Sequence, residues 1–339
     1  MMNRTKRSLP WKKDSKRLRN RIMLRKMMKQ IPPGPKRLII PVIILFLIKL
    51  SIVSEIPVMA AKVNMEQAND LRGEYLGQKK PGMKPEIFAP GIISTEDANE
   101  MDPAFHPDMN EFYFVRGYTY LVMKRKNNIW TDADTASFSG KYPDFEAFIT
   151  HDGKKLFFIS RRPPENWESY FVERSGPGGW KNARLIGENL KGAFYPTLSV
   201  KGNIYFTGFW HEGPPFSIYC SQPDNGRFTD PVKLPDEINN NGAFEALIAP
   251  DESFIIFGKA DRPDGYGGND LYISFRSDEG LWRDAVNMGQ GINTGFHDSR
   301  PVLSPDGKYF FFSSNRYGTN DIFWINSEII KKIKLENSN

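Results

Sequence analysis

The sequence predicts an all-β fold, a five-bladed propeller formed by residues 84–326, and three observations support this prediction. Aromatic residues make up 13% of the chain, and its 28 glycines and 25 prolines favour a globular structure with many turns. Five segments share one pattern of apolar strand, tight turn and aromatic-rich strand. A strand that the last repeat lacks is found ahead of the first repeat.

The five repeats are aligned by a polar residue in the turn between two apolar strands. These residues, Asp108, Asp152, Lys201, Asp251 and Asp306, are 44, 49, 50 and 55 residues apart, a spacing typical of four-stranded propeller blades. Proline, aspartate and glycine around them favour a tight connection. We therefore expect a hairpin at 104–114, 148–158, 197–206, 247–257 and 302–312.

Each hairpin is followed by two further predicted strands. The third strands are expected at 120–124, 170–174, 218–221, 270–275 and 321–325. The fourth strands are expected to begin at Trp130, Trp180, Phe228 and Trp282, and the periodic tryptophans are expected to pack in the core. The fifth repeat has no such strand, but residues 84–93 resemble the fourth strands of other repeats. An N-terminal strand would thus complete the last blade and close the ring, which removes exposed sheet edges.

Residues 1–60 are predicted to be a basic arm followed by a signal peptide. The apolar run at 38–47 follows basic residues and precedes the small residues Ala60 and Ala61, the pattern of a secretory signal with cleavage at that point. Lys49 interrupts the run before it reaches the length of a membrane-spanning helix.

The start of translation affects this prediction. A start at Met27 or Met28 would give a signal peptide of ordinary length, whereas a start at Met1 favours an uncleaved anchor with the basic arm in the cytoplasm. Downstream of the leader, residues 61–83 are expected to form a linker. Residues 327–339 have apolar side chains at helical spacing and are expected to form a short C-terminal helix and tail.

The charge of the chain is unevenly distributed. The formal net charge is +6, but residues 1–60 hold 15 of the 46 basic residues and only 2 of the 40 acidic ones. Residues 61–339 therefore keep 31 basic and 38 acidic side chains. A net-negative body gains no general counterion-release contribution from nucleic acid, so we expect no nucleic-acid partner.

The last two repeats carry the clearest family signature. The segments SPDGKYFFFSSNRYGTNDIFWI (304–325) and DRPDGYGGNDLYISFR (261–276) resemble the WD40-like propeller repeats of the TolB type, in particular those attached to OmpA-like cell-envelope proteins. The resemblance extends over all five repeats and is loosest in the third. It implies a propeller in the cell envelope or outside the cell, and it implies no reaction, because this scaffold does not determine function.

One aligned position just before each predicted inner strand is the candidate ligand site. The five residues are Asp102, Glu146, Tyr195, Glu245 and Arg300. Because the innermost strands of a propeller line its channel, these side chains are predicted to surround the channel mouth. Three carboxylates, a phenol and a guanidinium could bind a cation, a sugar or a basic peptide end. The alternative is structural: they cap strand ends or pair with neighbouring blades.

A second recurring set consists of arginines that follow the second strands. Arg316 is expected to pair with Asp321, and Arg262 with Asp270, by the bidentate hydrogen bonds that guanidinium and carboxylate groups favour. Such pairs would hold a hairpin in place. We therefore expect these arginines to be structural.

No catalytic or cofactor motif is found in the sequence. His106 and His151 take the turn position that proline fills in other repeats, so they are expected to be turn residues. Cys220 lies in an apolar strand without the electropositive surroundings of a reactive thiol. The glycine-rich tract at 264–270 lacks the spacing and terminal glutamate of a calcium-binding EF-hand. We predict no catalytic residue, no metal ligand and no cofactor.

Three functions remain open from the sequence. The first is an exported, non-catalytic binding propeller in the periplasm or outside the cell, with an envelope protein or an oligosaccharide as its partner. The second is a carbohydrate hydrolase or lyase that uses Asp102, Glu146 and Glu245, since glycoside cleavage needs paired carboxyl groups. The third is a sensory ectodomain on an uncleaved anchor, which contacts the membrane only through the N-terminal segment.

Overall fold

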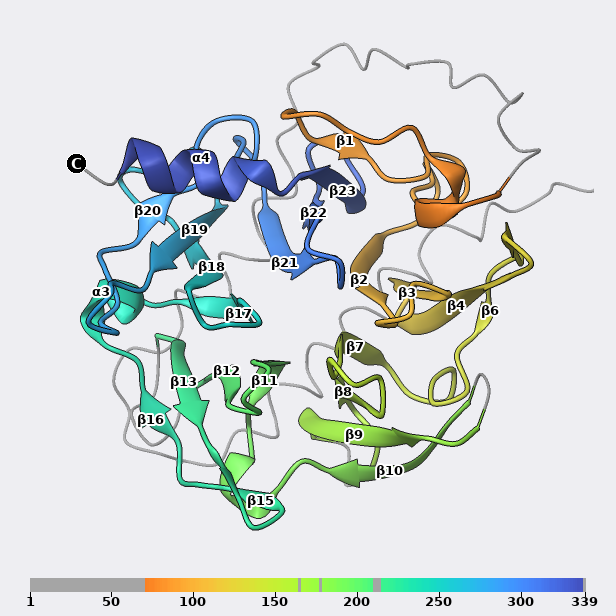
Figure 1. The fold of residues 1–339 in the computed structure, drawn as a ribbon, viewed down its shortest axis with the longest axis horizontal. Coiled ribbons are helices and arrows are strands. Elements are labelled where there is room, and N and C mark those ends of the chain that lie inside the picture. Colours follow the sequence, from red (N-terminus) through yellow and green to blue (C-terminus); the bar gives the residue numbers. More distant parts are fainter. Residues whose placement is uncertain (1–70, 164–165, 177–178, 210–214, 338–339) are drawn as a thin grey trace, which may run out of the picture. The chain divides into compact units, whose positions relative to one another are not determined.

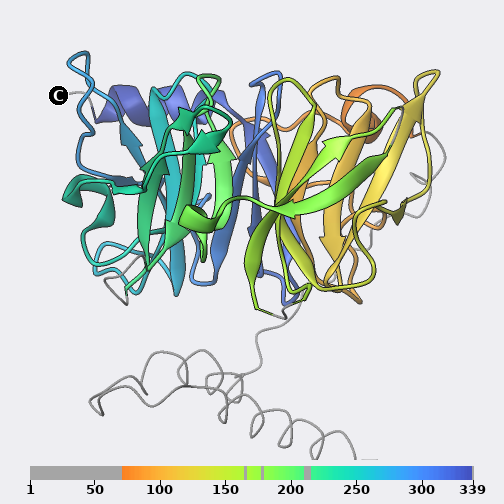
Figure 2. The ribbon, with the colours of Figure 1, turned by 90° about the horizontal axis from the view of Figure 1, so that it is seen from below.

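The structure, a computed structural model, describes residues 71–337 except for 164–165, 177–178 and 210–214. The predicted signal peptide, its alternative as an anchor and residues 61–70 lie outside the described residues. Within the described part of the chain, five sheets of strands surround a central axis (Figure 1). Figure 2 shows these strands running between the two ends of the propeller. The predicted five-bladed propeller is confirmed.

The first strand of each blade lies nearest the axis, beside the first strands of the neighbouring blades (Figure 1). The first strands are β2 (Glu100–Phe105), β7 (Asp144–Ile149), β11 (Phe194–Leu198), β17 (Phe244–Ile248) and β21 (Asp298–Leu303). The second strands are β3 (Glu111–Arg116), β8 (Lys155–Ser160), β12 (Ile204–Gly208), β18 (Phe254–Ala260) and β22 (Tyr309–Ser314). The third strands are β4 (Thr119–Lys126), β9 (Glu168–Arg174), β13 (Ser217–Ser221), β19 (Asn269–Phe275) and β23 (Asp321–Asn326).

The fourth, outer strands are mostly short and begin later than predicted. They are β6 (Asp134–Thr135), β10 (Trp180–Leu185), β16 (Val232–Lys233), β20 (Val286–Asn287) and β1 (Glu86–Ile87). Only β10 begins at the predicted aromatic residue. Trp130 pairs with Arg125, and Trp282 with Arg276, so each of these tryptophans first turns back onto the third strand. The smaller elements are β5 (Ile129–Trp130), β14 (Pro223–Asp224), β15 (Arg227–Phe228), η4 (Glu188–Leu190) and α3 (Asp236–Asn239).

The ring is closed by the strand nearest the N-terminus of the propeller. Strand β1 pairs antiparallel with β23, with Glu86 opposite Trp324 and Ile87 opposite Phe323. The fourth strand of the last blade thus comes from the opposite end of the chain, as predicted. This pairing covers the edge of β23 and links the first and last blades.

The described part of the predicted linker is not a linker. Residues 74–77 form the short 3-10 helix η3 (Glu74–Gly77), and Tyr75 and Leu76 are fully buried. Both belong to the apolar cluster between the last and first blades. The two-residue strand β1 is too short to fill this seam alone, so the segment ahead of it packs there as well.

The core is divided among the seams between blades. In the described residues, each seam holds one cluster of buried side chains drawn from the two blades that flank it. Trp130, Trp180 and Trp282 are buried in these clusters, which confirms their predicted packing role. The C-terminal helix α4 (Glu328–Glu336) also forms as predicted and buries Ile330 and Ile333 against the last two blades.

The arginines that follow the second strands have other partners than predicted. Arg316 pairs with Asp298 at 2.7 Å instead of Asp321, and Arg262 pairs with Asp264 at 3.3 Å instead of Asp270. Ser314 at the end of β22 lies opposite both Asp298 and Asp321, and the guanidinium of Arg316 contacts Asp298 on the first strand. Arg316 also donates to backbone carbonyls ahead of that strand, which supports a structural role.

Candidate functional site

The structure brings the five predicted ligand residues together at the axis, but inside the inner strands instead of before them. We call Asp102, Glu146, Tyr195, Glu245 and Arg300 the axial ring. The inner strands begin three or four residues earlier than predicted, so each ring residue is the second or third residue of its strand. Each ring residue lies at a register shift, where the first strand carries an extra residue relative to the second. The ring therefore lies within the channel, not at its mouth.

The backbone of every ring residue has the same unusual conformation. The φ angles of Asp102, Glu146, Tyr195, Glu245 and Arg300 are 53°, 58°, 51°, 54° and 55°. This left-handed region is unfavourable for residues other than glycine. Such residues persist only where their surroundings hold them in place, so five of them at one level of the channel indicate strong local interactions.

Side chains of the ring bind the backbone of the next blade. The Glu146 N–H donates to Asp102 Oδ2 at 3.1 Å, and the Tyr195 N–H donates to Glu146 Oε2 at 2.7 Å. The Arg300 N–H donates to Glu245 Oε2 at 3.0 Å. Arg300 Nε lies 2.7 Å from Asp102 Oδ1 but does not point at it in hydrogen-bond geometry, so this contact is an ion pair. The structural alternative thus accounts for much of the ring.

Tyr195 interrupts the pattern because a phenol cannot take over the role of a carboxylate. Its hydroxyl group donates across the channel to the Pro301 carbonyl oxygen at 3.2 Å. The Glu245 N–H is bound instead by Thr207 Oγ1 at 2.8 Å. Every residue of the axial ring therefore has a hydrogen-bond partner for its backbone N–H or for its side chain.

Burial dominates the electrostatics of the ring. It raises the pKa of Glu146 to about 8, and the negative charges of Asp102 and Glu245 add to this rise, while Arg300 opposes it. Burial also raises the pKa values of Asp102 and Glu245 against the attraction of Arg300. For Arg300, burial favours a lower pKa, but attraction to Asp102, Glu245 and Glu146 together outweighs it and raises the pKa.

A pocket of about 420 Å³ occupies the channel on one side of the ring. It extends from the turns between first and second strands to Glu146 and Tyr195, which form its floor. The other three ring residues are not among those that line it. Its walls include Ala104, Phe105, Phe148, Pro196, Leu247, Ile248, Pro301, Val302 and Leu303, and turn residues such as His151, Val200 and Pro250 surround its mouth. We call this cavity the central pocket.

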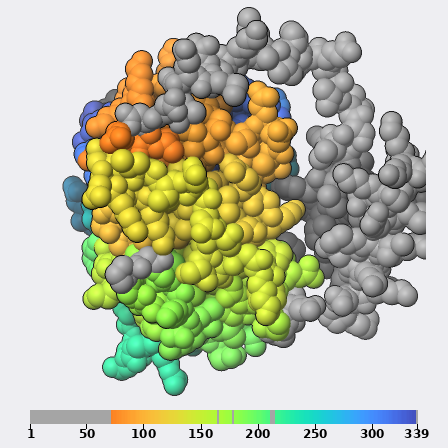
Figure 3. All heavy atoms as spheres, turned by 90° about the vertical axis from the view of Figure 1, so that its right-hand side faces the viewer, coloured from red at the N-terminus to blue at the C-terminus, as the bar shows by residue number. Residues whose placement is uncertain are grey.

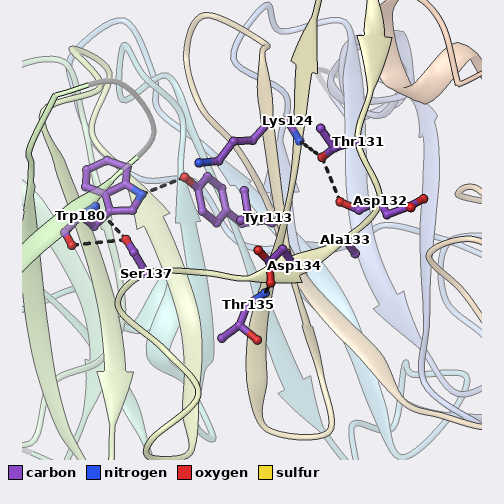
Figure 4. A pocket seen from close by; sticks show the side chains of 10 residues that line it. Tyr113, Lys124, Thr131, Asp132, Ala133, Asp134, Thr135, Ser137 and Trp180 are labelled. Atoms are coloured by element: carbon purple, nitrogen blue, oxygen red, sulfur yellow. Dashed lines mark hydrogen bonds between the residues drawn. The ribbon is translucent and has the colours of Figure 1, made fainter.

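A second hollow, the lateral groove, lies on the outside of the propeller between the first two blades. Blade 1 and blade 2 form the side that faces the viewer in Figure 3, and the groove has a volume of about 700 Å³. Figure 4 shows its wall, where Trp180 Nε1 donates to Tyr113 Oη at 2.8 Å. Tyr113 donates to Glu111, and Arg174 holds that carboxylate with two hydrogen bonds. These polar groups satisfy one another, so the wall is structural.

The other candidates from the sequence have structural surroundings. His106 Nε2 contacts the Gly153 carbonyl oxygen at 3.3 Å, and His151 Nε2 contacts the Leu198 carbonyl oxygen at 2.9 Å, so both turn histidines join neighbouring blades. Burial raises the pKa of the Cys220 thiol to about 11, which disfavours the reactive thiolate. Among the described residues, no group of three or more His, Cys, Asp or Glu side chains could hold a metal ion.

The raised pKa of Glu146 predicts a particular dependence of stability on pH. Between the ordinary value of 4.5 and about 8, the folded state holds a proton that the unfolded state releases. The stabilisation from this group is complete below about pH 4.5 and is lost as the pH rises through about 8, with a slope of at most about 1.4 kcal/mol per pH unit. Glu146→Gln should remove this contribution, so the variant gains stability relative to the wild type at high pH.

Urea unfolding at about pH 5 and about pH 9 checks this expectation. Exposed Glu96→Gln is the control and should follow the wild type at both pH values. The stability of Glu146→Gln should still decrease somewhat as the pH rises, because the pKa values of Asp102 and Glu245 are raised as well. A stability difference between Glu146→Gln and the wild type that is the same at both pH values would contradict the assignment.

Comparisons with known proteins place the fold. No protein-family model and no curated protein match the chain. Solved structures similar to it include a glycoside hydrolase, which is 10% identical over 73% of this chain and 92% of that chain with a TM-score of 0.50. Putative TolB from Agrobacterium tumefaciens is 14% identical over 74% and 86%, with a TM-score of 0.47. TolB from Acinetobacter baumannii is 15% identical over 67% and 54%, with a TM-score of 0.44.

These likenesses concern the fold alone. The structures similar to this chain include TolB proteins and a glycoside hydrolase. A scaffold shared by binding proteins and enzymes does not decide between these functions. The decision therefore rests on the axial ring and the central pocket.

Proposed function

We propose that this protein is an exported, non-catalytic binding propeller whose central pocket receives part of an envelope protein or a glycan. One observation carries the proposal: a mostly apolar pocket ends at a carboxyl group, while the rest of the axial ring is engaged in contacts between blades. Concave apolar sites with a few polar groups are the common form of ligand sites in proteins.

The enzyme alternative has one observation in its favour. Glu146 lines the pocket with a pKa of about 8, as expected of a general acid. Glycoside cleavage also needs a second carboxyl group facing the substrate, about 5 to 10 Å from the first. Asp102 and Glu245 do not line the pocket, and each accepts a backbone N–H of the next blade. We therefore propose binding without catalysis.

The exported location is part of the proposal and is supported by the leader at 1–60 and by the resemblance of the repeats. None of the helices in the described residues has the length and apolar character needed to cross a membrane. N-terminal sequencing of the native protein tests this part. A mature chain that begins near Ala61 would support export with cleavage, whereas an intact leader would favour the anchored, sensory alternative.

A thermal-shift screen against oligosaccharides, cell-wall fragments and envelope extracts tests the binding site. A ligand at about 100 times its dissociation constant should add about 2.7 kcal/mol of stability. Ala147→Phe, which fills the central pocket, should abolish the shift, whereas Ala133→Phe in the lateral groove should not. A shift that survives Ala147→Phe would contradict a site in this pocket, and turnover of an oligosaccharide would favour the enzyme alternative.

A further inference from the structure

The walls of the central pocket offer an apolar path to its floor. Phe148, Leu247, Ile248, Val302 and Leu303 line it, together with prolines from the inner strands and turns. Apolar walls favour an aliphatic or aromatic ligand body, because burial of apolar surface is favourable at roughly 25 cal/mol per Å². The volume of about 420 Å³ admits a small molecule or the end of a peptide.

Most polar side chains along this path are already occupied. Thr197 Oγ1 donates to the Ala246 carbonyl oxygen at 2.9 Å, and Ser304 Oγ donates to Asp306 Oδ1 at 2.8 Å. The Tyr195 hydroxyl donates to Pro301, as described above. None of these groups offers a free donor to a ligand.

Glu146 differs from these residues because only one of its carboxyl oxygens is occupied. Oε2 accepts the Tyr195 N–H, and no hydrogen bond from the described residues reaches Oε1. The pocket thus presents one open acceptor at its apolar end. When Glu146 is ionised, a ligand that reaches the floor must bring a donor, or this oxygen loses its hydrogen bonds to water without compensation.

The charges around Glu146 select a cationic donor. Asp102, Glu146 and Glu245 are three carboxyl groups, and they share one guanidinium, that of Arg300, which contacts Asp102. The phenol of Tyr195 adds no positive charge. A ligand cation would neutralise this excess of negative charge, whereas a ligand carboxylate would add to it.

We infer that the central pocket binds a protonated amine carried on an apolar chain, with the ammonium group donating to Glu146 Oε1. This inference rests on the proposed function and specifies its ligand. The ammonium group has three donors and a compact charge, so it can meet one carboxylate oxygen at the floor of the central pocket. The source is a small alkylamine or the amino terminus of a polypeptide that begins with apolar residues.

Binding should depend on pH in a characteristic way. Glu146 must ionise to pair with the ammonium group, so the affinity should increase as the pH rises towards about 8. The affinity should fall again as the amine loses its proton near pH 10. The carboxyl group of Glu146 also feels the charges of Asp102, Glu245 and Arg300. These charges shift the pH at which the affinity begins to rise, but the affinity still rises with pH.

Isothermal titration calorimetry with matched probes tests the inference. The probes are straight-chain primary amines, alcohols and carboxylates of equal chain length, titrated into the purified protein. At about pH 9, where Glu146 is ionised and the amine is still protonated, the amine should bind about ten- to hundred-fold more tightly than the alcohol, the range expected for a hydrogen bond to a charged group. The carboxylate should bind least tightly.

Two variants locate the effect. Glu146→Gln should lose the preference for amines but retain binding of the alcohol, because the apolar walls are unchanged. Glu168→Gln is the matched control: Glu168 Oε2 also accepts one backbone N–H, that of Gly192 at 3.1 Å, but it does not line the pocket. This variant should keep the full preference for amines.

The outcomes separate the inference from the proposed function. If the alcohol binds as tightly as the amine to the wild type, the inference is overturned, while the pocket remains a binding site. If no probe binds, the inference also fails, and the proposed function fails only if the thermal-shift screen is flat as well. A peptide with an apolar first residue, tested with a free and with an acetylated amino terminus, identifies the source. Loss of binding on acetylation supports the polypeptide source.

Discussion

Arg300→Met should lower the free energy of unfolding by about 3–5 kcal/mol, the loss typical of removing one partner from a buried ion pair. Asp102 is 2% exposed and lies 2.7 Å from the guanidinium, and Glu245 also faces it. Methionine preserves much of the side-chain volume, and the left-handed backbone at this position is equally unfavourable for both residues. The loss of stability in Arg300→Met therefore measures the effect of removing the positive charge.

Urea unfolding near neutral pH measures this loss. Arg184→Met is the control, because its ion pair with Glu173 is exposed and 3.6 Å long, and such pairs contribute at most about 1 kcal/mol. The double variant Asp102→Asn with Arg300→Met should be less destabilised than Arg300→Met alone, since it also removes the unpaired carboxylate. An Arg300→Met variant as stable as Arg184→Met would show that the axial ring is not held by this pair.

The architecture could be predicted because short-range chemistry repeats along the chain. Proline, aspartate and glycine at the turns determine local backbone conformation, and their recurrence between apolar strands located the hairpins, although the third turn keeps only Gly202 of this pattern. The closing strand could be predicted by elimination, because the last repeat lacked a fourth strand and residues 84–93 supplied one. Both inferences depend on neighbouring residues or on counting strands, and neither needs the positions of individual atoms.

The candidate site could be predicted only in part. The alignment of Asp102, Glu146 and Glu245 correctly placed them at one level of the channel. Their depth depended on a register shift in each inner strand, which no residue type in the sequence marks. The hydrogen bonds that their side chains accept come from backbone N–H groups of the next blade, which lie about 50 residues away in the sequence. Sequence spacing does not report such contacts.

The central pocket was missed for a related reason. Its walls come from residues such as Phe148, Leu247 and Val302, which follow the ring positions in the inner strands. Their apolar character was visible in the sequence, but core strands show the same pattern. Only the closure of the ring separates residues that face the channel from those that pack between blades.

Tyr75 is the residue for which sequence and structure differ most, and Tyr75→Ala should lower the free energy of unfolding by about 3–5 kcal/mol, as expected for a buried aromatic residue. Its ring is fully buried and lies 4.8 Å from Tyr309, 5.4 Å from Phe105 and 5.6 Å from Trp324 between ring centroids. These partners belong to the first and last blades, so the side chain fills the seam where the ring closes.

A second variant separates the packing of Tyr75 from its hydrogen bond. Its hydroxyl group donates to Asp306 Oδ1 at 2.5 Å, and Tyr75→Phe removes only this contact, at an expected loss of about 1 kcal/mol. Tyr118→Ala is the matched control, because Tyr118 also has a positive φ but is 64% exposed. Its loss should stay within about 0.5 kcal/mol.

Chemical denaturation of the three variants decides whether residues 71–83 belong to the propeller. A large loss for Tyr75→Ala, a small one for Tyr75→Phe and almost none for Tyr118→Ala would show that this segment is part of the folded core. Equal stabilities for Tyr75→Ala and Tyr118→Ala would instead support the linker that the sequence predicts. Because β1 contributes only two residues to the closing sheet, we expect the closure of the ring to depend on Tyr75 as much as on strand pairing.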